Sequence, residues 1–434
     1  MTGRDPKSII DDGAMGSAQW LAVLITVGLN ALDGFDVLSI SFASPGIARD
    51  WGIDKATLGW VLSMELMGMA AGSVLLGGVA DKVGRRPTIL GCLIAMAAGM
   101  LGAAQAHGVA ELLPWRLLTG LGIGGTLAAI NAAAAELANR RWRSFAMALM
   151  VIGYPLGGVI GGYFVQKLLA AGGWRTVFVA GGWATAVFLP LVWWLVPESV
   201  AFLDRRRGPG ALVEINRILA RFGHAAAGAL SAPHPEGERR SLADIFRPAL
   251  LATTVLVTFA YFAHITSFYF IVKWVPKIVV DMGFAPQAAA GVLTWVSLGG
   301  ATGGALFGLA ATRIGVRPLT IGTLLAGAVM VACFGRGAPG LEALKTTLAV
   351  TGFFTNAAIA GFYLLFAQVF PTHVRATGTG FAIGVGRGGA VLAPIVAGYL
   401  LNAGLAVKSV ALIMAGGSLA AAVALLALRV RDGD

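Results

Sequence analysis

Apolar residues occur along this chain in twelve long runs that polar segments separate. The runs lie at 18–44, 57–80, 88–106, 111–137, 144–169 and 174–196, and then at 249–276, 287–311, 317–336, 345–369, 376–402 and 407–428. A helix of ~20 predominantly apolar residues is long enough to cross a bilayer. The pattern therefore predicts an all-α polytopic membrane protein with twelve transmembrane helices.

One polar segment in the first half of the chain is repeated in the second half. Residues 77–87 read Gly-Gly-Val-Ala-Asp-Lys-Val-Gly-Arg-Arg-Pro, and a similar segment spans residues 308–318. In a hydrophobic chain such a repeat predicts two homologous six-helix bundles, here 1–197 and 248–434, with a solute path at their seam. The copy is imperfect, because Thr312 stands where Asp81 does and Val316 where Arg85 does. We expect the halves to be alike in fold and unequal in chemistry.

The longest polar segment, residues 198–247, joins the two predicted halves. Within it, residues 211–222 have the amphipathic pattern of a surface helix, for which a regulatory partner site is the alternative. The Pro-rich residues 232–236 that follow are predicted to be a flexible linker.

Composition supports the membrane interpretation. Hydrophobic residues make up 57% of the chain and charged residues 12%, whereas soluble domains carry ~25% charged residues. Cys92 and Cys333 both lie in apolar runs, which argues against a disulfide framework or a zinc site. The first apolar run is longer than a signal-peptide core, so we expect it to be a retained first helix. The net charge of +11 comes from basic residues in short loops, and no nucleic-acid partner is expected.

Lysine and arginine gather in one set of loops. They are frequent on the side of the N-terminus, including residues 198–247, and scarcer on the other side, to whose loops we assign Lys273 and Lys277. Cytoplasmic loops carry the excess of basic residues, so both termini are predicted to be cytoplasmic.

Three segments resemble the major facilitator superfamily. Residues 77–87 resemble the loop G-x-x-x-D-x-x-G-R-R between its second and third helices. Residues 116–124 resemble the pattern Arg-x-x-x-Gly-x-Gly of its fourth helix, and residues 197–199 resemble the motif that closes its sixth. The resemblance covers essentially the whole chain. It implies the major facilitator fold of two pseudo-symmetric six-helix bundles with a cavity between them.

Within that superfamily the chain is most similar to the aromatic acid:proton symporter family. The pattern D-G-x-D of that family's first helix occurs here as residues 33–36, and residues 371–387 resemble its passage from the tenth to the eleventh helix. The resemblance implies a transporter of the bacterial inner membrane that takes up hydroxylated benzoates, phenylpropionates and related acids. Glu65 departs from the family pattern, in which a small or apolar residue is expected.

Two acids in the first apolar run are candidates for proton coupling. Asp33 and Asp36 lie three residues apart, so both carboxylates project to the same side of a helix. A charge in mid-bilayer costs ~3 kcal/mol on insertion scales, and two neighbouring carboxylates cost more unless a proton is shared. We predict that they carry the coupled proton. The alternative is a pair of structural hydrogen-bond acceptors.

Arg116 and Arg387 are the arginines within apolar runs. Arg387 lies near the level of the midplane, and its planar guanidinium fits a carboxylate, so we predict that it binds the acid group of the substrate. Arg116 is expected to pair with Asp33, Asp36 or Glu65, unless it snorkels to the outer leaflet. Glu65 is then either a third proton site or the partner of Arg116. For both arginines the alternative is a static ion pair within one half.

Charged residues on the cytoplasmic side are predicted to gate. An acid such as Asp81 suits the positive N-terminal end of a neighbouring helix and would latch one conformation. Glu136 is expected to pair with Arg140 or Arg143. The gating set comprises Asp81, Arg85, Arg86, Glu136, Arg140, Arg143 and Arg375. A positive-inside anchor is the alternative for its basic members.

The substrate ring is expected to be bound by aromatic faces and by polar groups that read its substituents. His264 is the strongest candidate, and Asn30 and Asn131 are expected to face inward in the first half. The predicted substrate-binding set comprises Arg387, His264, Tyr261, Tyr269, Asn30, Asn131, Trp295, Phe354, Asn356 and Tyr363. For each, the alternative is contact with lipid or with a neighbouring helix.

Together these residues favour a proton-coupled importer of small aromatic carboxylates that works by alternating access, as a monomer and without a cofactor or metal. The sequence contains no nucleophile elbow, metal-spacing cluster or nucleotide loop, so no enzyme is expected. Residues 153–158 (Gly-Tyr-Pro-Leu-Gly-Gly) resemble a pattern associated with antiporters, which keeps an exporter as an alternative. The same residues are also compatible with a symporter of a non-aromatic acid and with a membrane sensor that binds without transporting.

Overall fold

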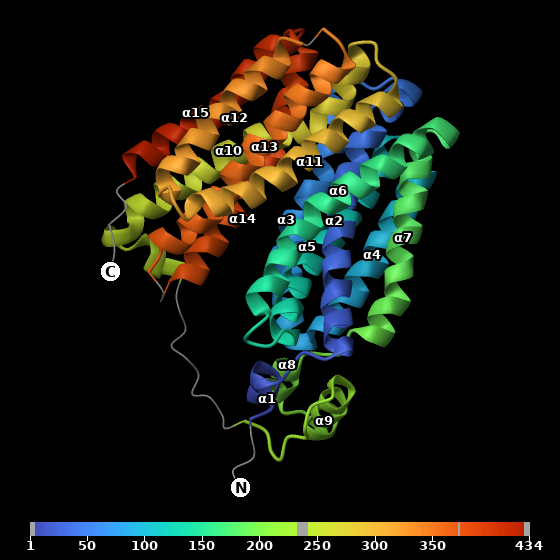
Figure 1. Cartoon of the computed structure of the whole chain (residues 1–434). Coiled ribbons are helices and arrows are strands. Elements are labelled where there is room, and N and C mark those ends of the chain that lie inside the picture. The colour runs from blue at the N-terminus through green and yellow to red at the C-terminus, as the bar shows by residue number, and fades with distance from the viewer. Residues whose placement is uncertain (1–4, 232–241, 338, 372–373, 429–434) are drawn as a thin grey trace. The chain divides into compact units, whose positions relative to one another are not determined.

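Fifteen α-helices and one 3₁₀ helix make up the part of the chain that the computed structural model describes, residues 5–231, 242–337, 339–371 and 374–428 (Figure 1). Twelve of these helices are long and apolar enough to cross a membrane. The membrane spans are α2 (Ser17–Trp51), α3 (Lys55–Val83), α4 (Arg85–Gln105), α5 (Val109–Leu137), α6 (Arg143–Gly172), α7 (Trp174–Leu195), α10 (Pro248–Asp281), α11 (Pro286–Ala311), α12 (Val316–Gly335), α13 (Leu341–Val369), α14 (Arg375–Asn402) and α15 (Val407–Ala427). The shorter elements are α1 (Pro6–Asp12), α8 (Val200–Arg206), α9 (Ala211–Phe222) and η1 (Leu242–Phe246).

The twelve predicted runs match the twelve spans, and the largest differences lie at the ends of α2 and α10. Each helix continues several residues beyond its apolar run and contains a proline, Pro45 in α2 and Pro276 in α10. The final turns carry charged residues such as Arg49 and Lys277. An apolar run ends where side chains become polar, whereas a helix ends where its backbone hydrogen bonds end. The hydropathy pattern therefore underestimates both helices.

By their internal contacts, the residues divide into two units. The first unit contains residues 1–36, 68–157 and 178–237, and the second contains residues 37–67, 158–177 and 238–434. One end of α2, α3 and α6 is thus grouped with the helices of the second half. The predicted division at residues 197 and 248 concerns the order of the spans along the chain and stays a prediction.

In the first unit, α1, α8 and α9 lie together at one end of the membrane spans (Figure 1). The helix predicted at 211–222 is confirmed as α9, with its apolar side chains, among them Ile215, Leu219 and Phe222, buried. Arg221 donates a hydrogen bond of 2.7 Å to the carbonyl of Trp194 at the end of α7. This part of the segment between the halves is therefore anchored to the first unit. The Pro-rich residues 232–236 lie outside the described residues.

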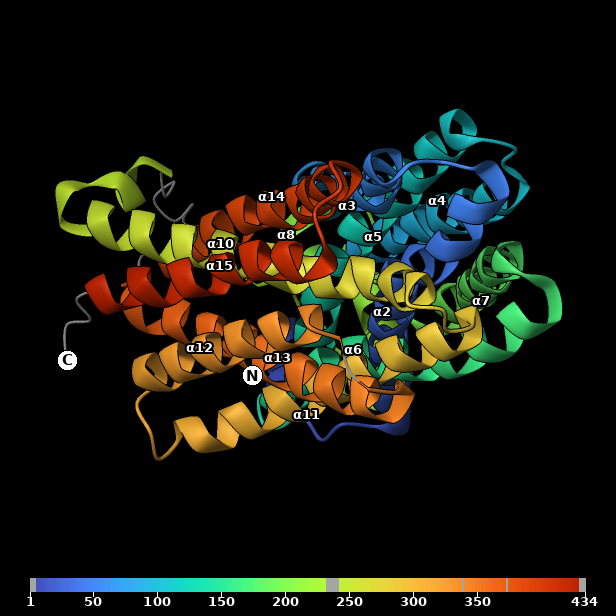
Figure 2. The same cartoon turned by 90° about the horizontal axis from the view of Figure 1, so that it is seen from above.

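In the second unit, α15 lies beside α10 and α12, α13 packs beside α11 and α12, and α14 lies beside α10 (Figure 2). The interface of α14 with α10 depends on small residues. A Cβ atom at Gly389 would lie 2.4 Å from the carbonyl oxygen of Phe262, and one at Gly386 would lie 2.3 Å from Cδ1 of Tyr261. Small residues let membrane helices approach closely in this way. The glycines around Arg387 therefore bring its helix against α10.

The repeated segments hold the same structural position in the two halves. Arg86, near the start of α4, donates a hydrogen bond to the carbonyl of Trp193 at the end of α7. Arg317, its counterpart near the start of α12, donates to the carbonyls of Leu425 and Leu426 at the end of α15, over 2.9 and 2.8 Å. Each arginine thus satisfies carbonyls at the C-terminal end of the last span of its half, where a cation is favoured.

Candidate functional site

Two buried acids occupy the middle of α2. The side chain of Asp33 is 1% exposed and that of Asp36 is 0% exposed. Neither carboxylate oxygen of Asp33 has a hydrogen-bond partner among the described residues. Burying a carboxylate in this way is costly unless it is protonated or neutralised. The chemistry of this segment therefore favours a group that exchanges a proton.

The glycine between these acids is required by close packing. A Cβ atom at Gly34 would lie 2.0 Å from the carbonyl oxygen of Tyr154 in α6, and one at Gly157 would lie 1.7 Å from the carbonyl oxygen of Ala31 in α2. Any other residue at either position would separate the two backbones. The glycine pattern at 153–158 is thus explained by the contact of α6 with α2, without reference to antiport.

Arg116 of α5 contacts the backbone of α2 beside these acids. Its Nη2 donates to the backbone carbonyl of Asp36 at 3.5 Å, and Nη1 approaches the sulfur of Met100 at 3.1 Å. Its guanidinium carbon lies 5.1 Å from the ring centroid of Phe178. The side chain is completely buried, so the snorkelling alternative is wrong. A cation held at this carbonyl stabilises negative charge in the adjacent part of α2.

Glu65 of α3 is paired with a residue outside the predicted proton-coupling set. Its Oε2 lies 3.5 Å from Nζ of Lys273 in α10, and both side chains are 0% exposed. The same Nζ donates a hydrogen bond of 2.5 Å to the carbonyl of Val37. The assignment of Lys273 to a loop is wrong, because α10 continues to Asp281. The position of Lys273 inside the predicted run 249–276 is the sequence signal that could have indicated its burial.

Tyr261 of α10 and Tyr363 of α13 form the polar part of an aromatic cluster beside α14. Their hydroxyl oxygens lie 3.5 Å apart, and Tyr261 also meets the rings of Phe362 and Phe366 edge-on at centroid distances of 5.4 Å. Tyr261 is buried, whereas Tyr363 is 45% exposed. Arg387 is half-buried and directly follows Gly386, which packs on the ring of Tyr261. An aromatic wall, hydroxyl groups and a guanidinium thus occur close together on α10, α13 and α14.

His264 is placed differently from the prediction. Its Nδ1 lies 3.0 Å from Oγ of Ser418 in α15, and Nε2 lies 3.0 Å from the carbonyl of Thr355 in α13. The ring stacks on Phe362 and is fully buried. Both nitrogens therefore join helices of the second unit, and neither is available to read a substituent on a solute.

The three asparagines of the predicted binding set also bond to backbone. Asn30 donates to the carbonyl of Met150 in α6. Asn131 and Asn356 each donate to a carbonyl of their own helix, Leu127 at 2.7 Å and Gly352 at 3.1 Å. Such bonds satisfy the amide hydrogens within the protein. For these residues the structure supports helix packing more than solute contact.

The remaining predicted ring-binding residues lie on three different helices. Trp295 of α11 is 44% exposed, whereas Tyr269 of α10 and Phe354 of α13 are half-buried. Tyr269 contacts Phe268 edge-on at 5.2 Å, and Phe354 contacts Phe353 in the same way at 5.2 Å. Both ring contacts are with the preceding residue of the same helix, so they do not by themselves join these side chains into one site.

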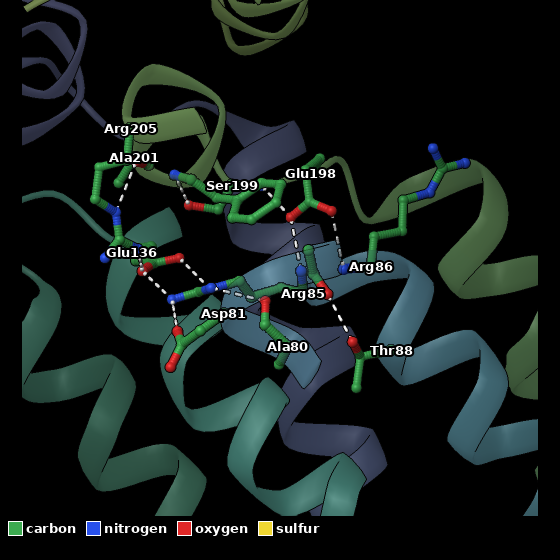
Figure 3. A network of polar contacts seen from close by, with 12 residues as sticks. Ala80, Asp81, Arg85, Arg86, Thr88, Glu136, Glu198, Ser199, Ala201 and Arg205 are labelled. Atoms are coloured by element: carbon green, nitrogen blue, oxygen red, sulfur yellow. Dashed lines mark hydrogen bonds and ion pairs between the residues drawn. The ribbon is translucent and has the colours of Figure 1, made fainter. Parts of the chain in front are cut away.

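A charged network surrounds the start of α4 at one end of the first unit (Figure 3). Arg85 binds Glu136 of α5 through two parallel contacts of 3.1 Å each, and its Nη2 lies 3.0 Å from Asp81. Arg205 of α8 approaches Glu136 at 3.7 Å. Arg85 is 6% exposed and Asp81 is 68% exposed. The buried arginine therefore joins α3, α5 and α8 at the start of α4.

This network corrects the predicted partners of Glu136. Glu136 pairs with Arg85 and Arg205, whereas Arg140 pairs with Asp12 at 3.6 Å and Arg143 pairs with Asp11. Proximity in the sequence favours the arginines after α5. The loop directs them instead toward α1, which lies beside it in the first unit. Arg375 lies at the start of α14, is exposed, and donates to the carbonyl of Phe370 at 3.3 Å.

Glu198 is an acid for which the sequence motifs predicted no individual role. Its carboxylate accepts hydrogen bonds from the backbone N–H groups of Arg85 (2.9 Å), Arg86 (3.3 Å) and Ser199 (2.8 Å) (Figure 3). The acid that stabilises the positive end of α4 is therefore Glu198, a role that we predicted for an acid such as Asp81. Burial raises the pKa of the Glu198 carboxyl, although these N–H groups and the charge of Arg85 act in the opposite direction.

Glu198→Ala should lower the stability of the protein by about 1 kcal/mol, because it removes the cap from α4. Glu198→Gln should lower it less, since the amide oxygen still accepts hydrogen bonds. Thermal unfolding of the purified protein in detergent measures both effects. Glu342→Gln is the control, because this exposed acid lies in the first turn of α13.

The pH dependence separates burial of this ionisable carboxyl from nonspecific destabilisation. A raised pKa means that the folded protein binds this proton more tightly than the unfolded chain does, so stability rises as pH falls. The wild type should therefore gain stability relative to Glu198→Gln as pH falls from neutral toward the ordinary value of 4.5. A constant difference over this range would contradict the assignment.

Comparison with known proteins defines the class to which this fold belongs. A family model of the Major Facilitator Superfamily matches residues 26–292 and 257–434. The fold is similar to the xylose transporter XylE from E. coli in a partially occluded inward open conformation. The TM-score is 0.76 at 17% sequence identity, over 96% of this chain and 99% of that one. The chain belongs to the major facilitator superfamily, and the predicted fold class is confirmed.

Three curated relatives have more specific descriptions. The gallate transporter of Pseudomonas putida is 30% identical over 98% of this chain and 94% of its own. The 4-hydroxybenzoate transporter PcaK of Pseudomonas putida is 32% identical over 92% and 90%. The 3-(3-hydroxy-phenyl)propionate transporter of Escherichia coli is 29% identical over 94% of each chain. The predicted resemblance to aromatic acid transporters is confirmed, and the protein is a multi-pass membrane transporter and not an enzyme.

Proposed function

We propose that this transporter imports small aromatic carboxylates of the hydroxybenzoate type together with protons. The full-length similarity to transporters for gallate and 4-hydroxybenzoate supports the substrate class. The proton gradient alone drives transport in this proposal, without a cofactor, and a monomer suffices. Alternating access exposes the solute to one side of the membrane at a time.

The observation that carries the proton coupling is the burial of Asp33 and Asp36. Two carboxylates three residues apart on one helix, both inaccessible to solvent, are tolerated best when at least one binds a proton. Arg116 lies at the carbonyl of Asp36 and favours the return of the acid to its charged form once the proton can leave. Both protonation states are therefore accessible during a transport cycle.

The features that suit an aromatic acid lie on α10, α13 and α14. The guanidinium of Arg387 provides two parallel donors for a carboxylate. Tyr261 and Tyr363 provide ring faces and hydroxyl groups that match a hydroxylated benzene ring. Phe354 of α13 and, on the separate helix α11, Trp295 are further aromatic candidates. A non-aromatic acid would use the arginine and leave this aromatic cluster without a role.

We place the protein in the bacterial inner membrane with both termini in the cytoplasm. Basic residues are frequent in α8 and in the loops on that side, for example Arg205, Arg206 and Arg207, which follows the positive-inside rule. Lys273 is buried within α10 and therefore does not count among the basic residues of the opposite loops. The excess of basic residues on the cytoplasmic side is correspondingly larger. Packing of α6 against α2 accounts for the glycines at 153–158, so they do not support export over import.

Uptake into proteoliposomes of labelled 4-hydroxybenzoate and gallate tests the proposal. An inward proton gradient should drive accumulation of at least one of them, and collapse of the gradient with a protonophore should abolish it. The neutral analogue 4-hydroxybenzamide should not accumulate. Efflux of the acids against an inward proton gradient would establish an antiporter and overturn the proposed direction.

A further inference from the structure

The first third of α3 is closely packed against α14 within the second unit. Ser63 donates a hydrogen bond of 2.8 Å to the carbonyl of Val391, and Trp60 donates one of 3.3 Å to the hydroxyl of Tyr399. A Cβ atom at Gly59 would lie 2.6 Å from the carbonyl of Pro394. Glu65 lies next to this contact layer along α3. Its side chain is 0% exposed, so the carboxylate is shielded from water.

The ammonium group of Lys273 contacts both a carbonyl and a carboxylate in this region. It donates to the carbonyl of Val37 over 2.5 Å, and the nearer oxygen of Glu65 lies 3.5 Å away. The hydrogen bond to the carbonyl is thus shorter than the contact with the carboxylate. Lys273 is held on α2 by an uncharged acceptor, while Glu65 supplies a negative charge. Removing the charge of Glu65 would leave the position of the ammonium group fixed.

Charge balance limits what this region accommodates. Two buried opposite charges stabilise each other, whereas a single uncompensated buried charge costs several kcal/mol. A second anion beside Lys273 would leave one excess negative charge. That excess disappears if Glu65 takes up a proton as the second anion arrives. Binding of an anion beside Lys273 together with protonation of Glu65 is therefore favoured, whereas either event alone is disfavoured.

We propose that Lys273 is a binding cation for the carboxylate of the substrate, which replaces Glu65 when Glu65 becomes protonated. The proton moves from solvent to the Glu65 carboxylate, and the substrate anion becomes the new counter-ion of Lys273. By linkage, the substrate raises the proton affinity of Glu65 by the same factor as the proton raises substrate affinity. This inference rests on the proposed function, because it takes the solute to be a carboxylate.

Lys273 and Arg387 would act at different depths. Arg387 of α14 directly follows Gly386, which packs on Tyr261 of α10. Lys273 lies twelve residues after Tyr261 on α10, a distance of about 18 Å along the helix at a rise of 1.5 Å per residue. The end of α10 beyond Lys273 is the one that carries Lys277 and Asp281. A carboxylate that approaches from this end meets Lys273 first and the guanidinium of Arg387 later.

Other titratable groups border this pair and affect the measurement of proton uptake. Asp36 of α2 directly precedes Val37, and Arg116 of α5 donates to the carbonyl of Asp36. Tyr269 and Lys277 lie on α10, one turn on either side of Lys273. Tyr399 of α14 accepts the hydrogen bond from Trp60. Asp36 is the one acid among them. Its contribution to proton uptake is removed by repeating the measurement in an Asp36→Asn background.

The test measures proton uptake and binding with the purified full-length protein in detergent. Addition of 4-hydroxybenzoate in a weakly buffered solution should cause proton uptake, and Glu65→Gln should reduce it by about one proton for each molecule bound. The variant should bind 4-hydroxybenzoate without loss of affinity, since the charge of Glu65 no longer competes with the substrate for Lys273. An unchanged proton count would overturn the proposal.

The lysine is tested by the preference for the acid over neutral 4-hydroxybenzamide. Lys273→Gln should reduce this preference by about 30-fold, and Lys273→Arg should retain most of it. Because Lys273→Gln leaves Glu65 buried without this cation, the uncharged double variant Glu65→Gln/Lys273→Gln provides a second route to the same measurement. Lys277→Gln, one turn along α10, is the matched control and should keep the wild-type preference.

The outcomes separate this inference from the proposed function. If the wild type neither binds nor accumulates 4-hydroxybenzoate or gallate, the proposed substrate class fails. If the wild type accumulates the acid and the double variant keeps both its acid preference and its proton uptake, the proposed function stands. In that case Glu65 and Lys273 are a structural ion pair, and the inference is wrong.

Discussion

Replacing Asp36 with asparagine should abolish proton-driven accumulation of 4-hydroxybenzoate, and Asp33→Asn should have the same effect. Asparagine keeps the size of the side chain but cannot exchange a proton, so the substrate would only equilibrate and its ratio across the membrane would fall to about one. Uptake into proteoliposomes with an inward proton gradient measures this ratio. A residual ratio above one in both variants would report the proton that Glu65 is proposed to bind together with the substrate.

Two controls distinguish lost coupling from lost folding. Exchange of labelled for unlabelled 4-hydroxybenzoate across the membrane, without a gradient, should persist in both variants, since it needs binding and movement but no net proton transfer. Asp50→Asn, at the end of the same helix, where the carboxylate accepts a hydrogen bond of 2.8 Å from Trp174, should accumulate substrate normally. Normal accumulation in both Asp33→Asn and Asp36→Asn would remove these acids from the coupling mechanism.

Replacing Arg387 with lysine should raise the KM for 4-hydroxybenzoate by about tenfold or more. Lysine keeps the positive charge but loses the planar fork with which arginine binds both carboxylate oxygens. The loss should appear mainly in KM, because the carboxylate is bound before and during the conformational change. Initial rates of uptake at increasing substrate concentration give KM and kcat separately.

Arg375→Lys is the matched control for this measurement. Arg375 lies at the start of the same helix, is exposed, and contacts the carbonyl of Phe370. Its replacement should leave KM unchanged. Wild-type affinity in Arg387→Lys would exclude bidentate binding of the substrate carboxylate by Arg387.

The membrane spans were predictable from the sequence because hydropathy and span length depend on the same physical constraint. A backbone in lipid must satisfy its own hydrogen bonds, so each long apolar run becomes a helix. The amphipathic helix at 211–222 was predictable for a similar reason, since its apolar positions have a helical period. Neither argument depends on which other part of the chain the helix contacts.

Pairings between distant residues could not be predicted in this way. Proximity assigns Glu136 to arginines a few residues away, but it binds Arg85 and Arg205, which lie far from it in the sequence. His264 has the chemistry of a binding residue, and only its contacts with Ser418 and Thr355 reveal its use in packing. The composition of a helix indicates which side chains are costly to bury, whereas the partner that offsets the cost is a property of the tertiary structure.

Glu65 is an intermediate case. Its position in an apolar run required a proton or a cation, and that requirement follows from the sequence. Arg116 is the favoured cation only as long as Lys273 is assigned to a loop. The structure pairs Glu65 with Lys273 at 3.5 Å. A lysine near the end of a long apolar run therefore needs the helix boundary before it can be assigned to solvent or to the interior.

The two arginines that bind the last span of each half have a consequence for interpreting related sequences. Arg86 and Arg317 occupy equivalent positions and perform the same mechanical task, while the residues before them in each repeat, Asp81 and Arg85 against Thr312 and Val316, have diverged. A single motif thus contains two kinds of information. The second arginine and the proline indicate that a bundle has been duplicated, and the acid and the first arginine indicate which copy carries an ion-pair network. A search that scores the motif as one unit would therefore detect the duplication and miss the difference in charged residues between the two copies.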